Sequence, residues 1–392
     1  MLEINTTHLE RLGWDKDRDA ELRTLLLEIP EPGPTVENAD SGPKLAAQSE
    51  GYLVGRISFV SRKHFLVHDG QNEIAARALG GQTMQACVGD WALCRRVGSG
   101  PAVLVQLLTR KNLLSRKAPG KRPEPQHLAA NLDVVFLVAG LDEAFNLARQ
   151  ERLVSAIRAS QIEPVVVLNK SDLGGTLQRD RIAAASASGT ETVLVTSALR
   201  GQGLDLIKEY VPFGHTAALI GSSGAGKSTL INALLESGKI ATGPVRRGDS
   251  KGRHTTTNRR LYEIPDAGLL IDMPGIREWQ LWTPAGNPGV TEGFADIEQL
   301  AETCAFRDCR HESEPGCQVR LAIEAGHLDA ARLRSFQKLQ REEAYFRERY
   351  PEITSGREDR IHPGGFDKKR QLKGLHKKYR RIQQEKRRRQ GR

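Results

Sequence analysis

The fold of this chain follows from the stretch HTAALIGSSGAGKSTLINAL, residues 215–234. An apolar run leads into GSSGAGKST, which fits the phosphate-loop pattern G-x-x-x-x-G-K-[ST], and a helical pattern follows it. Glycines let backbone N–H groups turn toward phosphate oxygens, the lysine adds charge for the β and γ phosphates, and the serine is a ligand for Mg²⁺. The predicted phosphate-binding residues are Gly221, Ser222, Ser223, Gly224, Ala225, Gly226, Lys227, Ser228 and Thr229.

Apolar runs and helical patterns alternate on the amino-terminal side of this stretch. The runs LDVVFLVAG (132–140), PVVVLNK (164–170) and ETVLVTSA (191–198) are separated by segments with helical periodicity. Continuous apolar runs rich in β-branched residues are typical of parallel strands that are buried on both faces. The sequence therefore predicts an α/β domain that binds a nucleotide at the carboxyl ends of its strands.

Two short motifs at the ends of these runs indicate which base is bound. In the N-K-x-D motif the Asp172 carboxylate can accept the N1–H and the 2-amino group of guanine, and adenine offers no such pair of donors. The backbone N–H of Ala198 can reach the guanine O6 from the next strand end. Each motif in isolation is also compatible with an ordinary polar turn. The predicted guanine-binding residues are Asn169, Lys170, Ser171, Asp172, Thr196, Ser197 and Ala198.

A third pattern, Asp272-Met273-Pro274-Gly275, ends the apolar run GLLI. An aspartate at this place can order Mg²⁺, and the Gly275 N–H can meet the γ-phosphate; the alternative is a turn that closes a hairpin. The polar segment GRHTTT, residues 252–257, lies between this pattern and the phosphate loop. One of its threonines can give a hydroxyl to Mg²⁺, and spacing does not choose among Thr255, Thr256 and Thr257. Predicted magnesium ligands are Ser228, Asp272 and, as the switch candidate, Thr256.

The order of these motifs differs from that of Ras-like GTPases, in which the phosphate loop comes first and the guanine motif late. Here the guanine motifs at 169 and 196 precede the phosphate loop at 221 and the D-x-P-G pattern at 272. A chain can be permuted in this way because both the cut and the join fall in surface loops. The motif order therefore predicts a circularly permuted GTPase.

Three of the five cysteines lie within fourteen residues of one another, in the polar stretch ETCAFRDCRHESEPGCQ. Three thiolates and one imidazole form a closed tetrahedral set suited to one structural Zn²⁺, with no position left open for catalysis. A reduced, buried cysteine cluster is the alternative, but the stretch is too polar for a core. The predicted zinc ligands are Cys304, Cys309, His311 and Cys317.

The amino-terminal part of the chain has a different pattern. Short alternating runs between Gly51 and Arg110, separated by glycine and polar turns, indicate a small β-barrel, with a sandwich or open sheet as the alternative. The predicted parts are an arm and linker (1–48), a barrel (49–112), a basic tether (113–130), the GTPase domain (131–282), a zinc-binding domain (283–352) and a basic tail (353–392).

The net charge of +10 is concentrated at the carboxyl end of the chain. Residues 367–392 contain 13 Lys or Arg and 2 Asp or Glu, so the rest of the chain is nearly neutral. This composition favours contact with RNA or DNA, because neutralising phosphates releases counterions; the alternative is a solvated tail. No apolar run is long enough for a membrane span and no signal peptide is evident, so we expect a cytoplasmic monomer without a membrane partner.

Taken together, residues 48–350 resemble the ribosome small-subunit-dependent GTPase A family, also known as RsgA or YjeQ. The resemblance rests on GDW (89–91), the tether LSRKAPGKR (114–122) leading to AANLD, the permuted motif order, GRHTTT and the Cys-Cys-His-Cys cluster. It implies an α/β circularly permuted Ras-like P-loop GTPase domain, an OB-fold barrel before it and a mainly helical zinc domain after it. It also implies late maturation of the small (30S) ribosomal subunit, contact with its rRNA, and release after subunit-stimulated GTP hydrolysis.

The residue that orients the attacking water differs from that of Ras-like proteins. Ile276 stands where Ras-like proteins carry the glutamine that orients the attacking water, and an apolar side chain cannot do so. His254 is the candidate by similarity to the histidine of the family motif; a solvated loop histidine is the alternative. A nucleotide-gated RNA-binding module with incidental hydrolysis is the second functional hypothesis, and a P-loop ATPase or kinase the third.

Overall fold

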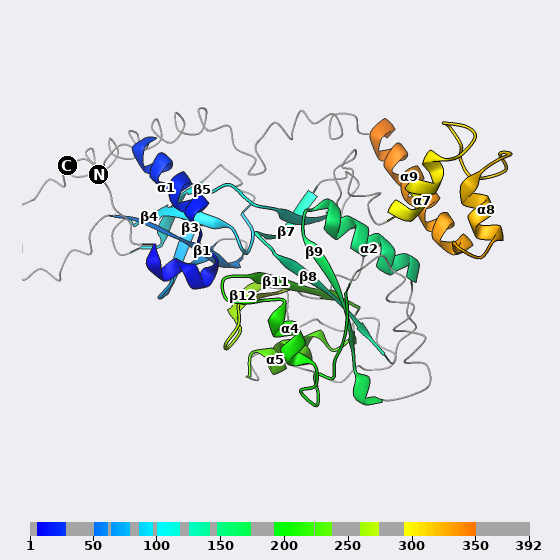
Figure 1. Ribbon diagram of the computed structural model, residues 1–392. Helices are drawn as coiled ribbons and strands as arrows, with labels where there is room; N and C mark the ends of the chain where they lie inside the picture. The colour runs from blue at the N-terminus through cyan, green and yellow to red at the C-terminus, as the bar shows by residue number, and fades with distance from the viewer. Residues whose placement is uncertain are drawn as a thin grey trace, which may run out of the picture.

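In a computed structural model of the 392-residue chain, the amino-terminal barrel and the carboxyl-terminal helices lie at opposite ends of a central α/β domain (Figure 1). The structure describes residues 6–28, 51–61, 64–78, 86–96, 100–117, 125–141, 147–173, 192–222, 224–236, 259–273 and 294–349.

Five strands close into a barrel near the amino terminus. They are β1 (Tyr52–Val60), β2 (Phe65–His68), β3 (Glu73–Ala78), β4 (Trp91–Arg95) and β5 (Ala102–Leu107). The order is β1-β2-β3-β5-β4 and back to β1, with β3 and β5 parallel and the other pairs antiparallel. This is the OB-fold arrangement, and it confirms the predicted barrel over the sandwich. Both cysteines of this region, Cys87 and Cys94, are buried.

The stretch expected to be a tether contains two further strands. β6 (Leu113–Lys117) and β7 (Pro125–Ala130) pair as an antiparallel two-stranded sheet. Leu114 and Ala129 are opposite one another and fully buried, so apolar contacts hold a segment whose charge and proline content suggested an open linker. In its described residues, the connection between barrel and α/β domain is thus a pair of antiparallel strands.

Within the described residues, the central domain contains an α/β sheet of six strands: β8 (Val134–Gly140), β9 (Glu163–Asn169), β10 (Val193–Val195), β11 (Thr216–Gly221), β12 (Arg260–Glu263) and β13 (Leu269–Asp272). They lie in the order β10-β9-β8-β11-β13-β12, all parallel except β12. Counted from the phosphate-loop strand β11, this is the Ras-like order with its last three strands moved to the front of the chain. The predicted circular permutation is confirmed.

Helices cover both faces of this sheet (Figure 1). Alternate residues of β8 face opposite sides: Val135 and Leu137 join the cluster that contains α2 (Leu147–Ala159). Val134, Phe136 and Val138 join the cluster that contains α4 (Leu204–Glu209) and α5 (Lys227–Leu234). Burial on both faces explains why these strands read as continuous apolar runs.

The carboxyl-terminal domain consists of α7 (Ala295–Glu302), α8 (Gln318–Glu324) and α9 (Ala330–Arg349) around its own small core. Phe294 and Phe336 pack at its centre with ring centroids 5.5 Å apart. Arg332 of α9 forms ion pairs with Asp296 and with the buried Glu151 of α2, and so joins this domain to the central one. Within the described part of the chain, no helix has the length and hydropathy to cross a membrane.

The arm expected at the amino terminus is docked rather than extended. A 3₁₀ helix (Thr7–Leu12) and α1 (Lys16–Glu28) bury a set of apolar side chains against the barrel and the central sheet. Trp14 meets Trp91 of β4 edge to face, with centroids 4.8 Å apart. The buried residues of this segment are Leu9, Leu12, Trp14, Leu22 and Leu25.

Arg56 of β1 lies where the amino-terminal segment, the barrel and the central domain meet, and it is 1% exposed. Its guanidinium donates to the backbone oxygens of Leu12 (2.6 Å), Gly89 (3.1 Å) and Asn131 (2.8 Å) and to Oγ1 of Thr216 (2.7 Å). Burial is the main cause that lowers the pKa of Arg56 to about 9.

Arg56→Met should lower the free energy of unfolding by about 3–5 kcal/mol, because it leaves several buried acceptors without a donor. Urea unfolding followed by tryptophan fluorescence would measure this, since Trp14 and Trp91 lie at the same junction. Arg77→Met, at an exposed position of β3, is the matched control and should change the midpoint little. Equal midpoints for the two variants would contradict a structural role for Arg56.

Candidate functional site

The sequence motifs meet at one edge of the central sheet. Asn169, Gly221 and Asp272 are the last residues of β9, β11 and β13, and Thr196 directly follows β10. The register aligns these ends, with Asn169 paired to Gly140, Gly221 to Val138 and Asp272 to Leu219. The carboxyl edge of a parallel sheet is where open α/β folds bind ligands, so the motifs lie where a nucleotide is expected.

The phosphate loop needs its glycines. Gly224 and Gly226 have φ values of 91° and 88°, which residues other than glycine rarely adopt. A Cβ atom on Gly226 would come within 2.4 Å of the Asn169 Nδ2, and one on Gly221 within 2.1 Å of the Val138 oxygen. The loop leads into α5, whose amino-terminal end carries partial positive charge.

Lys227 is the first residue of α5, and its side chain turns back over the loop. Its Nζ donates to the backbone oxygens of Gly221 (2.7 Å) and Ser222 (2.5 Å). The ammonium group therefore lies over the segment whose N–H groups are expected to meet phosphates. Ser228 and Thr229 follow it in the first turn of the same helix.

Asn169 connects the guanine motif to the phosphate loop. Its Nδ2 donates to the Ala225 oxygen (3.0 Å), while its Oδ1 accepts from the Ala198 N–H (3.0 Å) and the Thr196 hydroxyl (3.2 Å). The side chain is 1% exposed, so its orientation is determined by these three bonds. One buried amide thus holds three of the predicted nucleotide-binding segments together.

Asp172 and Ser197 form a further contact between the two guanine motifs, beside the Ser171 N–H that donates to the Thr196 oxygen (3.0 Å). The Ser197 hydroxyl donates to Oδ1 of Asp172 at 2.5 Å and accepts from the Arg200 N–H at 3.2 Å. The Ser197 hydrogen bond is the main cause that lowers the pKa of Asp172. The carboxylate is therefore oriented and ionised, as two guanine donors would require. Lys170 has a left-handed φ of 69°, and Ser171 begins the short 3₁₀ helix that carries Asp172.

Asp272 is buried at the end of β13, with an exposed fraction of 7%. Burial raises its pKa to about 6, and the charge of Lys227 acts in the opposite direction. A carboxylate and a hydroxyl are oxygen donors of the kind that Mg²⁺ prefers, so Asp272 and Ser228 fit this ion chemically.

Several predicted residues lie outside the described part of the chain. These are Ser223, His254, Thr255, Thr256, Thr257, Gly275 and Ile276.

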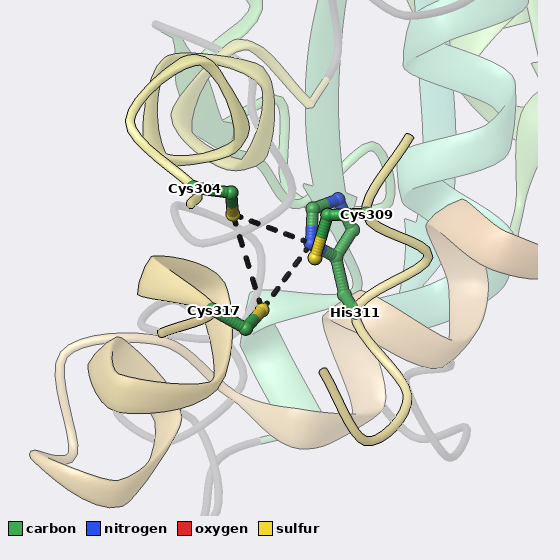
Figure 2. A group of neighbouring side chains, drawn as sticks. All are labelled: Cys304, Cys309, His311 and Cys317. Carbon is green, nitrogen blue, oxygen red and sulfur yellow. Dashed lines mark hydrogen bonds between the residues drawn. The ribbon is translucent and has the colours of Figure 1, made fainter. Parts of the chain in front are cut away.

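A second site lies in the carboxyl-terminal domain, where all four predicted metal ligands converge (Figure 2). Their ligand atoms all lie within 4.8 Å of one another. Nδ1 of His311 is 3.7 Å from Sγ of Cys304 and 3.4 Å from Sγ of Cys317, and the two sulfurs are 4.0 Å apart. Zinc–sulfur bonds of ~2.3 Å in a tetrahedron place sulfurs about 3.8 Å apart, so the donor set and its spacing fit zinc.

Local backbone features shape the loop between α7 and α8 that carries these ligands. Glu314 accepts N–H groups from Arg310, Glu312 and Ser313, and backbone hydrogen bonds lower its pKa to about 2. His311 has a left-handed φ of 63°. Glu314 is not among the residues that the sequence predicts for this site, because its hydrogen bonds become apparent only in the folded loop.

Comparison with protein families gives a match over the central domain. A family model described as RsgA GTPase matches residues 107–282. Small ribosomal subunit biogenesis GTPase RsgA of Opitutus terrae is 40% identical over 329 residues, which cover 80% of this chain and 89% of that protein. The RsgA 2 protein of Vibrio parahaemolyticus is 43% identical over 258 residues, covering 66% of this chain and 70% of its own.

Two solved structures share the architecture. YjeQ from Thermotoga maritima has a TM-score of 0.55 and 25% identity, and the match covers 75% of this chain and 99% of that one. YloQ, described as a circularly permuted GTPase, has a TM-score of 0.53 and 22% identity, with 79% and 99% covered. The latter supports the fold alone.

Proposed function

The chain belongs to the RsgA GTPase family and is a GTPase, and from this premise we propose that it acts in late maturation of the small (30S) ribosomal subunit. The relatives named above as small ribosomal subunit biogenesis GTPases support this role. The observation that best supports GTP binding is the position of the Asn169 side chain. Its hydrogen bonds connect both guanine motifs to the phosphate loop at the edge of the permuted sheet.

In the proposed mechanism the phosphate loop and Lys227 bind the phosphates, while Asp172 and Ala198 bind the guanine. Ser228, Asp272 and one threonine of the segment 252–257, with Thr256 as the candidate, would hold Mg²⁺, which would neutralise charge on the phosphate oxygens. Because Ile276 cannot orient water, we assign that task to His254. The ionised Asp172, oriented by Ser197, selects GTP over ATP, which argues against an ATPase or kinase.

Zinc, bound by Cys304, Cys309, His311 and Cys317, has a structural role in this proposal: one ion per chain stabilises the carboxyl-terminal domain.

We propose that the barrel, the zinc domain and the basic tail (353–392) contact the subunit and its rRNA, and that hydrolysis to GDP releases the protein. The 13 Lys or Arg of residues 367–392 would neutralise phosphates and make binding dependent on salt. We also propose that the chain divides into its parts after residues 48, 112, 130, 282 and 352. The protein is a monomer and is located in the cytoplasm in this proposal.

GTP turnover with and without purified 30S subunits tests this role against an RNA-binding module with incidental hydrolysis. The unchanged protein should hydrolyse GTP faster in the presence of the subunit. Equal rates of GTP hydrolysis with and without the subunit would favour the RNA-binding module.

His254→Ala should retain GTP affinity and lose about a hundredfold of the stimulated turnover, because an oriented proton acceptor for water is removed. Turnover and nucleotide binding are measured on the same preparation. His327→Ala, an exposed histidine of the carboxyl-terminal domain, is the matched control. Normal stimulated turnover in His254→Ala would show that another group orients the water.

A further inference from the structure

Strand β12 is the edge of the central sheet that meets the barrel. Its Arg260 pairs with Asp272 of β13 on one side and with Phe59 of the barrel strand β1 on the other. The barrel is therefore joined to the GTPase sheet by direct strand pairing. An otherwise open sheet edge is covered by another part of the same chain.

Both charged side chains of β12 face groups of opposite charge outside the central domain. Arg260 forms an ion pair with Glu73 of the barrel strand β3. Glu263 lies 3.5 Å from Arg11 of the amino-terminal segment and 3.6 Å from Nε2 of His68 in β2. Charges of alternating sign along the strand thus match those of the surface on which it lies.

A second residue of the barrel, Ser58, fixes the orientation of the Glu73 carboxylate. Oε1 of Glu73 accepts the hydroxyl of the buried Ser58 at 2.7 Å, and its other carboxylate oxygen takes the Arg260 guanidinium. The side chains of Glu73 and Arg260 are 28% and 39% exposed, so water screens the pair only in part. A carboxylate fixed on a closed barrel provides a defined point of attachment for the strand.

Strand β12 also lies beside the proposed magnesium ligand. Arg259, just before β12, donates to the backbone oxygen of His127 in β7. On its other side Arg260 is opposite Asp272, the last residue of β13 and the proposed magnesium ligand. Arg260 therefore lies between the barrel and one element of the proposed catalytic centre.

We propose that Glu73 is a positioning residue for GTP hydrolysis: by holding Arg260, the barrel fixes strand β12 beside Asp272, the proposed magnesium ligand. This inference rests on the proposed function and adds a role for the barrel in turnover. Glu73 touches neither nucleotide nor magnesium ligands in the described contacts, and it acts through Arg260.

The test compares four variants of the full chain for GTP affinity and for turnover with 30S subunits: Glu73→Gln, Glu73→Arg, Arg260→Glu, and the exchange Glu73→Arg with Arg260→Glu. Glu73→Gln should lower kcat about three- to fivefold, and Glu73→Arg about tenfold or more because two like charges then meet. KM for GTP should stay within about twofold, since the phosphate loop and guanine motif are unchanged. The exchange should recover most of the turnover lost by Glu73→Arg. Glu163→Gln, at an exposed position at the start of β9, is the matched control and should behave as the unchanged protein.

Two results would overturn the positioning role while the proposed function stands: normal stimulated kcat in Glu73→Arg, or a loss that the exchange does not recover. The second result would mean that general packing, rather than the ion pair, is required. If the unchanged protein binds GTP but shows no stimulation by the subunit, the proposed function fails, and the role of Glu73 in it is overturned as well.

Discussion

Asp172→Asn should weaken GTP binding by about 10²- to 10³-fold and improve binding of xanthosine triphosphate. In the proposed guanine site the carboxylate accepts two guanine donors, whereas an amide would bring N–H groups toward the 2-amino group and leave it unpaired. Xanthine carries a carbonyl at that position, and the amide can donate to it. Because Ser197 donates to Oδ1, the same hydroxyl can keep the amide oxygen on its side and turn the amide nitrogen toward the base.

A competition assay with GTP, ATP and xanthosine triphosphate measures this change. Asp205→Asn, in the exposed first turn of α4, makes the same chemical change away from the guanine motif and should leave the ranking unchanged. If Asp172→Asn also keeps the ranking, this carboxylate does not read the base.

Removal of the metal should unfold the carboxyl-terminal domain. Structural zinc contributes an apparent ~10–16 kcal/mol in small domains, and the core around Phe294 and Phe336 is too small to replace that contribution. Cys317 belongs to both the cluster and this core, so loss of the ion exposes apolar side chains directly. We expect one zinc per chain in the reduced protein and loss of the helical signal of residues 295–349 on chelation.

His311→Ala, compared with His327→Ala, separates the cluster from a surface histidine. The first should lose zinc and become sensitive to proteolysis in the domain, and the second should do neither. GTP affinity should change less than about twofold in both, because the nucleotide motifs lie on another core. Elemental analysis without zinc, or a stable domain in His311→Ala, would contradict a structural metal.

The motifs of the nucleotide site could be found from sequence because each is local. A glycine loop before a helix, or four polar residues after a buried strand, has its chemistry in a few consecutive residues. Parallel packing then makes their convergence a geometric necessity, since the strand ends share one edge. The cysteine spacing is local in the same way, and the buried runs of β8 and β9 predict their own strands.

Contacts between residues that are far apart in the sequence could not be predicted when neither residue lies in a distinctive local pattern. Arg56 looks like any charged residue of an alternating strand, and its burial depends on Leu12 and Thr216, which lie on either side of it in the chain. The short helices of the amino-terminal segment lack a distinctive pattern, because their apolar residues match a surface made by two other domains.

Local chemistry in the sequence therefore predicted the nucleotide motifs, the permuted order and the four residues of the metal cluster. The docked amino-terminal segment, the pairing of β6 with β7 and the pairing of Glu73 with Arg260 required the folded chain. The physical reason is that an ion pair between residues 187 positions apart carries no periodic or local signal in the sequence. Its energy arises only when strand pairing brings the two side chains together and partly excludes water.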